Sequence, residues 1–277
     1  MRRAIALAAA LWALVAATPV VRAADVFIPG FWETNQRLEK PEMSGLKAIR
    51  FLTDDDYPPM HFLSEDGRLS GFNVDLARAL CDILNVACTI QARRWDTLLD
   101  ALKEGRGDAV IASLRATKEL RSSFGLTTPY LRTPARFVGK QNAPGSLTAD
   151  ALAGRTVAVV EGSAHESFLR TFFPKATLVP VNDLERAKSA LQRGDAELLF
   201  GDGLTLAVWL NTEDGARCCS FAGGPYTESR WFGEGVVIAL RSNDPLLRRA
   251  LDYALQRAAE TGVHAELYLR WFPVGFY

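Results

Sequence analysis

The chain has 277 residues, of which 48% are hydrophobic, and it carries 32 basic and 32 acidic residues. This apolar content is enough for one large hydrophobic core or for two smaller ones. The basic residues are scattered along the chain and form no cluster, so the charge distribution argues against a nucleic acid as partner.

The first 23 residues have the features of a secretory leader. Arg2 and Arg3 give a charged start, and residues 4–17 form an unbroken apolar run of 14 residues. Val21 and Ala23 place small residues at the spacing that signal peptidase accepts. A bilayer span needs about 20 apolar residues, so the run is too short to serve as an anchor. Removal of the leader and its three arginines leaves 29 basic and 32 acidic residues, a net charge of −3, and we expect a mature protein that is soluble outside the cytoplasm.

Residues 24–45 contain prolines and glycines among mixed charges, which predicts an extended arm before the first folded domain. The arm carries an aromatic pair, Phe31 and Trp32. We expect this pair to pack on the folded body as a clasp, because Trp is highly buried on average.

Strands and helices alternate through the rest of the chain. Alternating β-branched and apolar residues predict the strands, and apolar residues at helical spacing predict the helices. The predicted strands are residues 49–53, 88–92, 109–112, 156–160, 197–200 and 236–240, and the predicted helices begin near Asn73, Asp96, Ser163, Asp183 and Asp244. This alternation predicts an α/β fold.

Two stretches repeat one pattern, in which a helix leads through Gly-Asp-Ala into an apolar strand that ends in a polar side chain. The first reads KEGRGDAVIAS and ends at Ser113, and the second reads QRGDAELLFGD and ends at Asp202. In an open α/β sheet, ligands bind outside the carboxyl ends of the strands. We therefore expect Ser113 and Asp202 to face each other across a cleft that captures a small solute.

The four cysteines of an exported chain are expected to form disulfides. Cys81 lies on a predicted helix and Cys88 lies beyond its end, so a bond between them would close a short loop and stabilise the fold by roughly 2 to 3 kcal/mol. Cys218 and Cys219 are neighbours, and strain in such a bond leaves two unbridged thiols as the alternative. The three histidines are scattered and provide no cluster for a metal.

Many separate motifs, in order, resemble the family 3 periplasmic solute-binding proteins of ABC importers. They are TDDDYPPMHFLSEDGRLSGFNVDLARALCDILNVACTI, RWDTLLDALKEGRGDAVIASLRAT, TTPY, GRTVAVVEGSAHESFL, FAGGPYTESRWFGEGVVIALRSNDPLLRRALDYAL and YLRWF, within residues 47–273. The similarity is greatest to the branch that binds histidine and lysine, arginine or ornithine.

This resemblance implies the type II periplasmic binding protein fold, with two Rossmann-like lobes joined by two crossing strands. Lobe 1 would comprise residues 46–134 and 232–277, and lobe 2 residues 135–231. Cys81 and Cys88 occupy the places of the helix-end disulfide of that branch. The resemblance further implies a periplasmic monomer without catalytic activity, metal or cofactor, which closes over a ligand and delivers it to an ABC permease in the inner membrane.

The resemblance also implies which residues hold the ligand's side chain. Asp54 and Tyr57 match the acidic and aromatic positions after the first strand, and Trp95 matches the aromatic residue opposite. Two rings in these places would hold a flat or cationic group between them. Considered alone, the residues allow another interpretation, because Tyr57 and Trp95 could be core residues and Asp54 could cap a turn.

Other matched positions imply groups for the two charged ends of an amino acid. Ser113 and Thr117 match a polar run that binds the ligand's carboxylate. Gly162 and Ser163 match a turn whose backbone N–H groups share that task at the start of a helix. Asp202 matches the acid that pairs with the α-ammonium group, which would give a buried carboxylate its partner.

One position departs from the family pattern Thr-x-x-Arg, whose arginine binds the carboxylate. Leu120 stands in the arginine's place. Arg121 could replace it only after a one-residue shift, which swings a helical side chain by about 100°. We favour Arg115, which lies beside Ser113 at the strand end. If both arginines are solvated surface residues, the ligand need not carry an amino-acid carboxylate.

Two other functional classes remain open. A periplasmic enzyme of the cyclohexadienyl dehydratase type, built on the same scaffold, would need a general acid or base in the cleft, and Glu161 or His165 could serve. A sensor ectodomain or the solute-binding half of a cell-wall enzyme would require more chain, whereas a binding protein that signals through a separate receptor would not.

Overall fold

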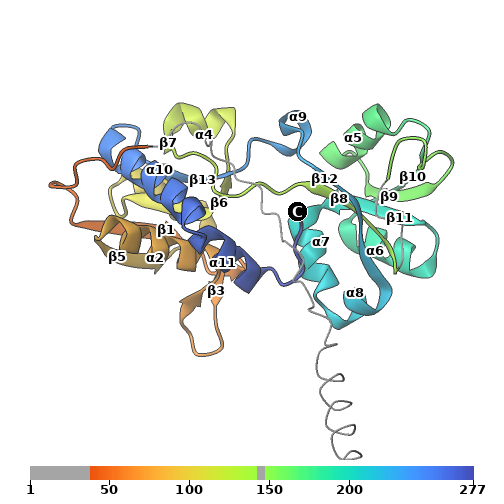
Figure 1. Ribbon diagram of the computed structural model, residues 1–277, viewed down its shortest axis with the longest axis horizontal. Coiled ribbons are helices and arrows are strands. Elements are labelled where there is room, and N and C mark those ends of the chain that lie inside the picture. The colour runs from red at the N-terminus through yellow and green to blue at the C-terminus, as the bar shows by residue number, and fades with distance from the viewer. Residues whose placement is uncertain (1–37, 142–146) are drawn as a thin grey trace, which may run out of the picture.

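The computed structural model describes residues 38–141 and 147–277, which form two lobes, each built around a five-stranded sheet with helices on both sides (Figure 1). The predicted α/β class is confirmed. The leader, residues 1–23, and residues 24–37 of the arm, with Phe31 and Trp32, lie outside the described residues. Residues 38–45 contain no helix or strand, as expected for an arm.

The sheet of the first lobe has the strand order β5-β1-β6-β13-β7. Strands β1, β5 and β6 run parallel, and β13 pairs antiparallel with both β6 and β7. The strands are β1 (Ala48–Thr53), β5 (Ala87–Ala92), β6 (Ala109–Arg115), β7 (Gly125–Leu126) and β13 (Val236–Leu240), and the helices are α2 (Phe72–Leu84), η1 (Trp95–Thr97), α3 (Leu98–Lys103), α4 (Lys118–Ser123), α10 (Pro245–Glu260) and α11 (Val263–Trp271). A small sheet of β2 (Asp56–Tyr57), β3 (His61–Leu63) and β4 (Leu69–Ser70) follows β1.

The sheet of the second lobe has the order β10-β9-β11-β8-β12, with β8 antiparallel to both of its neighbours. The strands are β8 (Ala135–Lys140), β9 (Thr156–Val160), β10 (Thr177–Val181), β11 (Leu198–Asp202) and β12 (Cys219–Tyr226), and the helices are α5 (Ala164–Phe172), α6 (Leu184–Arg193), α7 (Gly203–Leu210), α8 (Glu213–Cys218) and α9 (Ser229–Phe232). The strands of each sheet lie within the lobe boundaries that the sequence predicts, and the boundaries themselves stay a prediction.

Each sheet is apolar on both faces because helices cover both faces. Alternate residues of a strand point to opposite sides. In β1, Phe51 belongs to the core under α2 and α10, whereas Leu52 belongs to the core under α3. In β9, Val157 and Val159 face the aromatic core under α5, whereas Ala158 faces α6.

Two connections cross between the lobes side by side (Figure 1). Leu131 pairs with Val236 at the first lobe, and Ala135 pairs with Tyr226 at the second. The C-terminal tail crosses as well, because the buried guanidinium of Arg136 donates from Nη1 to the Phe276 carbonyl at 3.1 Å. The lobes are therefore held at one side by paired backbone.

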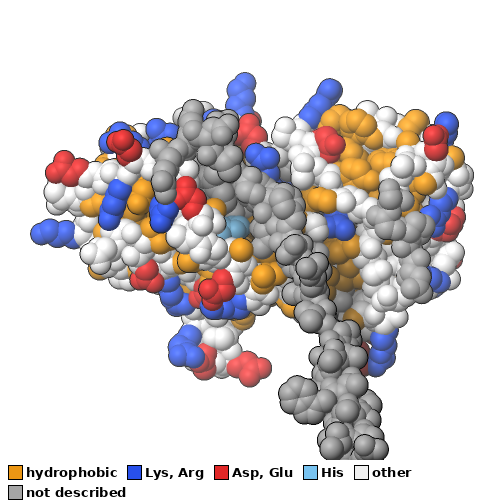
Figure 2. All heavy atoms as spheres, viewed as in Figure 1, with side chains coloured by type: hydrophobic (Ala, Val, Ile, Leu, Met, Phe, Trp, Pro, Cys, Tyr) orange, Lys and Arg blue, Asp and Glu red, His pale blue; other side chains and the backbone are white. Residues whose placement is uncertain are grey.

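Figure 2 shows basic and acidic side chains interspersed over the visible face. Within residues 38–141 and 147–277, no helix combines the length and the apolar content that a membrane crossing requires.

All four cysteines are paired. The predicted bond between Cys81 and Cys88 is confirmed and ties the end of α2 to β5, with a Cα–Cα distance of 5.9 Å. Cys218 and Cys219 are also joined, at the junction of α8 and β12. The alternative of two unbridged thiols is therefore not what the structure shows.

We predict that replacing Cys81 and Cys88 together by alanine destabilises the protein by about 2.5 kcal/mol, the chain-entropy value for closing so short a loop. The melting temperature should fall by roughly 5 to 10 °C, measured by calorimetry. The matched control replaces Cys218 and Cys219, whose bond closes almost no loop. Equal melting temperatures for wild type and the Cys81/Cys88 variant would contradict the prediction.

A second prediction concerns His264, which is 3% exposed and whose Nε2 lies 2.7 Å from the Tyr130 carbonyl. Burial lowers the pKa of His264, and the hydrogen bond acts the other way. The unfolded chain takes up this proton near its ordinary pKa of about 6.5 and the folded chain does not, so unfolding becomes easier as pH falls below that value. In urea titrations between pH 7.5 and 5, H264Q should lose stability less steeply than wild type; equal slopes would contradict this.

Candidate functional site

A cavity of about 600 Å³ opens on the first lobe at the carboxyl ends of its central strands. Its walls come from the segment after β1, from η1, and from the end of β6 with the loop into α4. The lining residues are Asp54, Asp56, Tyr57, His61, Trp95, Ala112, Ser113, Leu114, Arg115, Thr117 and Leu120. The structure thus brings together every binding residue that was expected on the first lobe.

The side chains of the two expected aromatic residues are partly exposed in this cavity. The Tyr57 side chain is 43% exposed and that of Trp95 is 56% exposed. Large aromatic side chains are mostly buried in folded proteins. These exposures exclude the interpretation of both rings as core residues and leave two apolar surfaces available to a solute.

Asp54 is held by a buried histidine that the sequence did not single out. His61 is 1% exposed, and its Nε2 lies 2.6 Å from Asp54 Oδ1. The Asn73 Nδ2 group donates to His61 Nδ1 at 2.8 Å, so Nδ1 accepts and the ring nitrogen that faces Asp54 is Nε2. Burial lowers the pKa of His61, and Asp54 acts in the opposite direction. Asp54 therefore has a fixed orientation and is more than a turn cap.

The same network reaches Ser113. Asn73 Nδ2 also lies 3.0 Å from Ser113 Oγ, and the Tyr130 hydroxyl donates to Asn73 Oδ1 at 2.9 Å. Ser113 has φ 55°, a left-handed conformation that is uncommon outside glycine and is often found at binding sites. Burial raises the pKa of Tyr130, whereas backbone and side-chain hydrogen bonds from Ser113 lower it.

Asp202 approaches the cavity from the second lobe. Its Oδ1 accepts from the backbone N–H and the hydroxyl of Thr205, both at 2.9 Å, and so caps α7. Its Oδ2 lies 3.8 Å from Arg115 Nη2. Among the described residues, this ion pair is the one that joins the two lobes, and it brings the ends of β6 and β11 together.

The charges of this ion pair act on one ring from each lobe. Burial raises the pKa of Tyr57, Asp202 raises it further, and Arg115 lowers it. Burial lowers the pKa of His165, with Asp202 and Arg115 acting in opposite directions. The His165 ring stacks on Phe232 with centroids 5.3 Å apart. Tyr57 of the first lobe and His165 of the second lobe are therefore both within reach of the charges of this ion pair.

The turn at Gly162 and Ser163 is not part of the cavity wall. The Gly162 N–H donates to Glu166 Oε2 at 2.7 Å, and Ser163 Oγ donates to the Val160 carbonyl at 2.6 Å. Ser163 Oγ also accepts from the Glu166 N–H at 3.1 Å, which caps α5. Both residues thus form hydrogen bonds within the second lobe, and their role in ligand binding stays a prediction.

The structure distinguishes Arg115 from Arg121 as a replacement for the arginine of the family pattern. Leu120 lines the cavity, as its position in the sequence indicates. Arg121 forms an ion pair with Glu234 and is not among the lining residues. Within the described part of the chain, Arg115 is the one lysine or arginine that lines the cavity.

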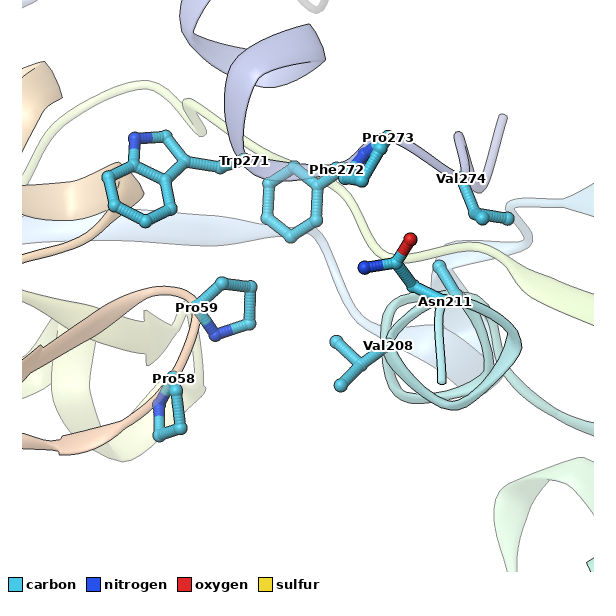
Figure 3. A pocket seen from close by; sticks show the side chains of 9 residues that line it. Pro58, Pro59, Val208, Asn211, Trp271, Phe272, Pro273 and Val274 are labelled. Carbon is cyan, nitrogen blue, oxygen red and sulfur yellow. The ribbon is translucent and has the colours of Figure 1, made fainter. Parts of the chain in front are cut away.

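A second hollow, of about 180 Å³, also lies between the lobes. Pro58, Pro59 and Phe272 of the first lobe face Val208 of α7 and Asn211, which directly follows α7, across it (Figure 3). Its lining is almost wholly apolar, so it offers little chemistry for binding a charged solute.

Known proteins of similar sequence include two named as arginine-binding proteins. The putative ABC transporter arginine-binding protein 2 of Escherichia coli K12 is 34% identical over 226 residues, which cover 82% of this chain and 91% of the relative. The L-arginine-binding protein of Pseudomonas aeruginosa is 29% identical, with 87% and 93% covered.

Solved structures show the same fold. An ancestral cationic amino acid solute-binding protein matches with a TM-score of 0.61 at 26% identity, over 81% of this chain and 95% of that one. The L-cystine solute receptor of Neisseria gonorrhoeae, in its unliganded open conformation, matches with a TM-score of 0.71 at 21% identity, over 83% and 94%. The family model of the bacterial extracellular solute-binding proteins, family 3, matches residues 49–274, and the chain belongs to this family.

Proposed function

We propose that this protein is the periplasmic solute-binding component of an ABC importer and that it captures a polar amino acid or a related small organic cation between its lobes. One observation carries the proposal. A cavity with two exposed aromatic rings and two carboxylates, Asp54 and Asp56, lies opposite a third carboxylate, Asp202, on the other lobe.

The rings and the carboxylates would share the work of binding. Tyr57 and Trp95 would cover the apolar or cationic body of the solute, because a cation is attracted to the face of an aromatic ring. Asp54, oriented by His61, would accept from one end of the solute, and Asp202 from the other. The proposed binding residues are Asp54, Tyr57, Trp95, Ser113, Arg115, Thr117, Gly162, Ser163 and Asp202.

Closure of the lobes would complete the site. The two paired connections at residues 127–134 and 227–235 would act as the hinge, and closure would bury the rings and exclude water. The closed form would present one surface made of both lobes to an inner-membrane permease. Cleavage of the predicted leader would leave the protein soluble in the periplasm, where the permease is accessible.

We propose that the protein is not an enzyme. The specific observation that favours the enzymatic alternative is His165, a residue of lowered pKa on which the Asp202 and Arg115 charges both act. A cyclohexadienyl dehydratase would turn over prephenate or arogenate. We expect no turnover of either compound by the purified protein.

A thermal-shift screen tests the proposed function. The mature protein, stripped of bound solute by partial unfolding and dialysis, would be heated with amino acids, opines, polyamines and small organic acids. A solute that binds only the folded state raises the melting temperature in proportion to the logarithm of its concentration. No shift with any compound would contradict the proposed function.

We predict that D202N weakens binding of the solute that emerges from this screen. Asparagine caps a helix as well as aspartate does, so α7 keeps its cap while the charge is lost. Loss of a charge-assisted hydrogen bond of about 1.5 to 3 kcal/mol weakens Kd by roughly 10- to 150-fold, measurable by calorimetry.

The matched control is D183N. Asp183 caps α6 on the same lobe through a 2.8 Å bond from the Arg186 N–H and does not line the cavity. We expect wild-type affinity for D183N. Equal affinities of D202N and D183N would remove Asp202 from the binding site.

A further inference from the structure

We infer that the solute is an organic cation without a carboxylate, an amine or guanidinium compound equivalent to a decarboxylated basic amino acid. The inference rests on the proposed function and narrows its solute class. Its basis is that, among the described residues, the cleft has three carboxylates against one arginine.

A carboxylate taken out of water is strongly destabilised unless cations or several N–H and O–H donors surround it. Among the described residues, Arg115 is the one lysine or arginine lining the cavity, and its guanidinium lies 3.8 Å from Asp202. A ligand carboxylate would therefore have a single cation available, and it would have to draw Arg115 away from Asp202. Leu120 lines the same wall at the position where the family pattern has an arginine, and its side chain is apolar.

The serine and threonine hydroxyl groups on the cavity wall are largely engaged. Ser113 Oγ accepts from Asn73, and Ser113 interacts through its backbone and its side chain with the Tyr130 oxygen. Thr117 Oγ1 accepts from the Leu120 N–H at 3.1 Å to cap α4, which leaves one neutral hydroxyl hydrogen. One hydroxyl does not replace the hydration of a carboxylate.

The second lobe adds the carboxylate of Glu166, which repels a ligand's carboxylate. The N–H of Gly162 is bonded to Glu166, whose carboxylate stands in the first turn of α5. Glu166 is also paired with Arg170 at 2.6 Å, so this acid is held in place. A second carboxylate at the same turn would have to displace Glu166 from a short hydrogen bond and from the helix N-terminus that favours it.

Carboxylates, in contrast, outnumber cations among the described residues at the cavity. Asp54 and Asp56 line the cavity, and Asp202 faces it, against the single charge of Arg115. His61 is kept neutral by burial and the hydrogen bond from Asn73 to its Nδ1, so it orients Asp54 without neutralising it. The net negative charge and the rings of Tyr57 and Trp95 favour a cation with no negative group.

Isothermal titration calorimetry with matched pairs tests the inference. Each pair differs by the carboxylate alone: agmatine with arginine, putrescine with ornithine, cadaverine with lysine, and histamine with histidine. We expect at least one amine to bind at least tenfold more tightly than its amino acid. An amino acid that binds as tightly as its amine, or tighter, in every pair that binds would overturn the inference.

The variant L120R supplies the missing guanidinium on the cavity wall. It should improve the affinity for the amino acid relative to its amine by at least tenfold. The control S122R adds the same charge to the exposed side of α4, outside the lining residues, and should keep the wild-type preference. Equal shifts in both variants would assign the effect to long-range charge and count against the inference. If L120R does not fold, the wild-type pairs decide alone.

Failure of the inference and failure of the proposed function give different results. If no member of any pair binds while a solute that carries a carboxylate raises the melting temperature, the inference is overturned and the binding function stands. If no solute binds at all, both are overturned.

Discussion

The site depends on one constraint, which is that the carboxyl ends of β1, β6 and β11 all meet the space between the lobes. Parallel strands place their carboxyl ends on one edge of a sheet, and the paired connections between the lobes turn those two edges toward each other. Asp54, Ser113 and Asp202 each stand at such an end. Their proximity follows from the strand order, and their chemistry follows from the residues placed there.

A buried network makes the first lobe's half of the cleft rigid. His61 and Asn73 connect Asp54 to Ser113 through polar contacts of 2.6 to 3.0 Å, and both are almost fully buried. Such a network restricts the orientation of the groups that a solute would meet, which lowers the entropy lost on binding. In the proposed closure, the second lobe would bring Asp202 to this preformed half.

The sequence predicted the parts of the fold that depend on local patterns. The strands at residues 156–160 and 236–240 and the caps at Asp183 and Asp244 appear where the pattern placed them. Strands β8 and β12 were not predicted, because they are identified by antiparallel pairing between segments about 80 residues apart. Local pattern contains no information on such pairing.

Motif positions predicted which residues of the first lobe line the cavity. Which of these residues already have a partner depends on contacts that are distant in the sequence. The pair of Arg121 with Glu234 and that of Arg115 with Asp202 join residues about 90 to 110 positions apart. The use of the Gly162 N–H by Glu166 could have been suspected, since an acid three residues after a capping serine is a known pattern. His61 gave no signal in the sequence.

The central claim is that the cleft between the lobes selects a cation. Native mass spectrometry of the protein released from the periplasm, followed by fragmentation of any solute that dissociates, tests it most directly. The account predicts a bound amine or guanidinium compound without a carboxylate. Release of an α-amino acid or an organic acid would contradict it.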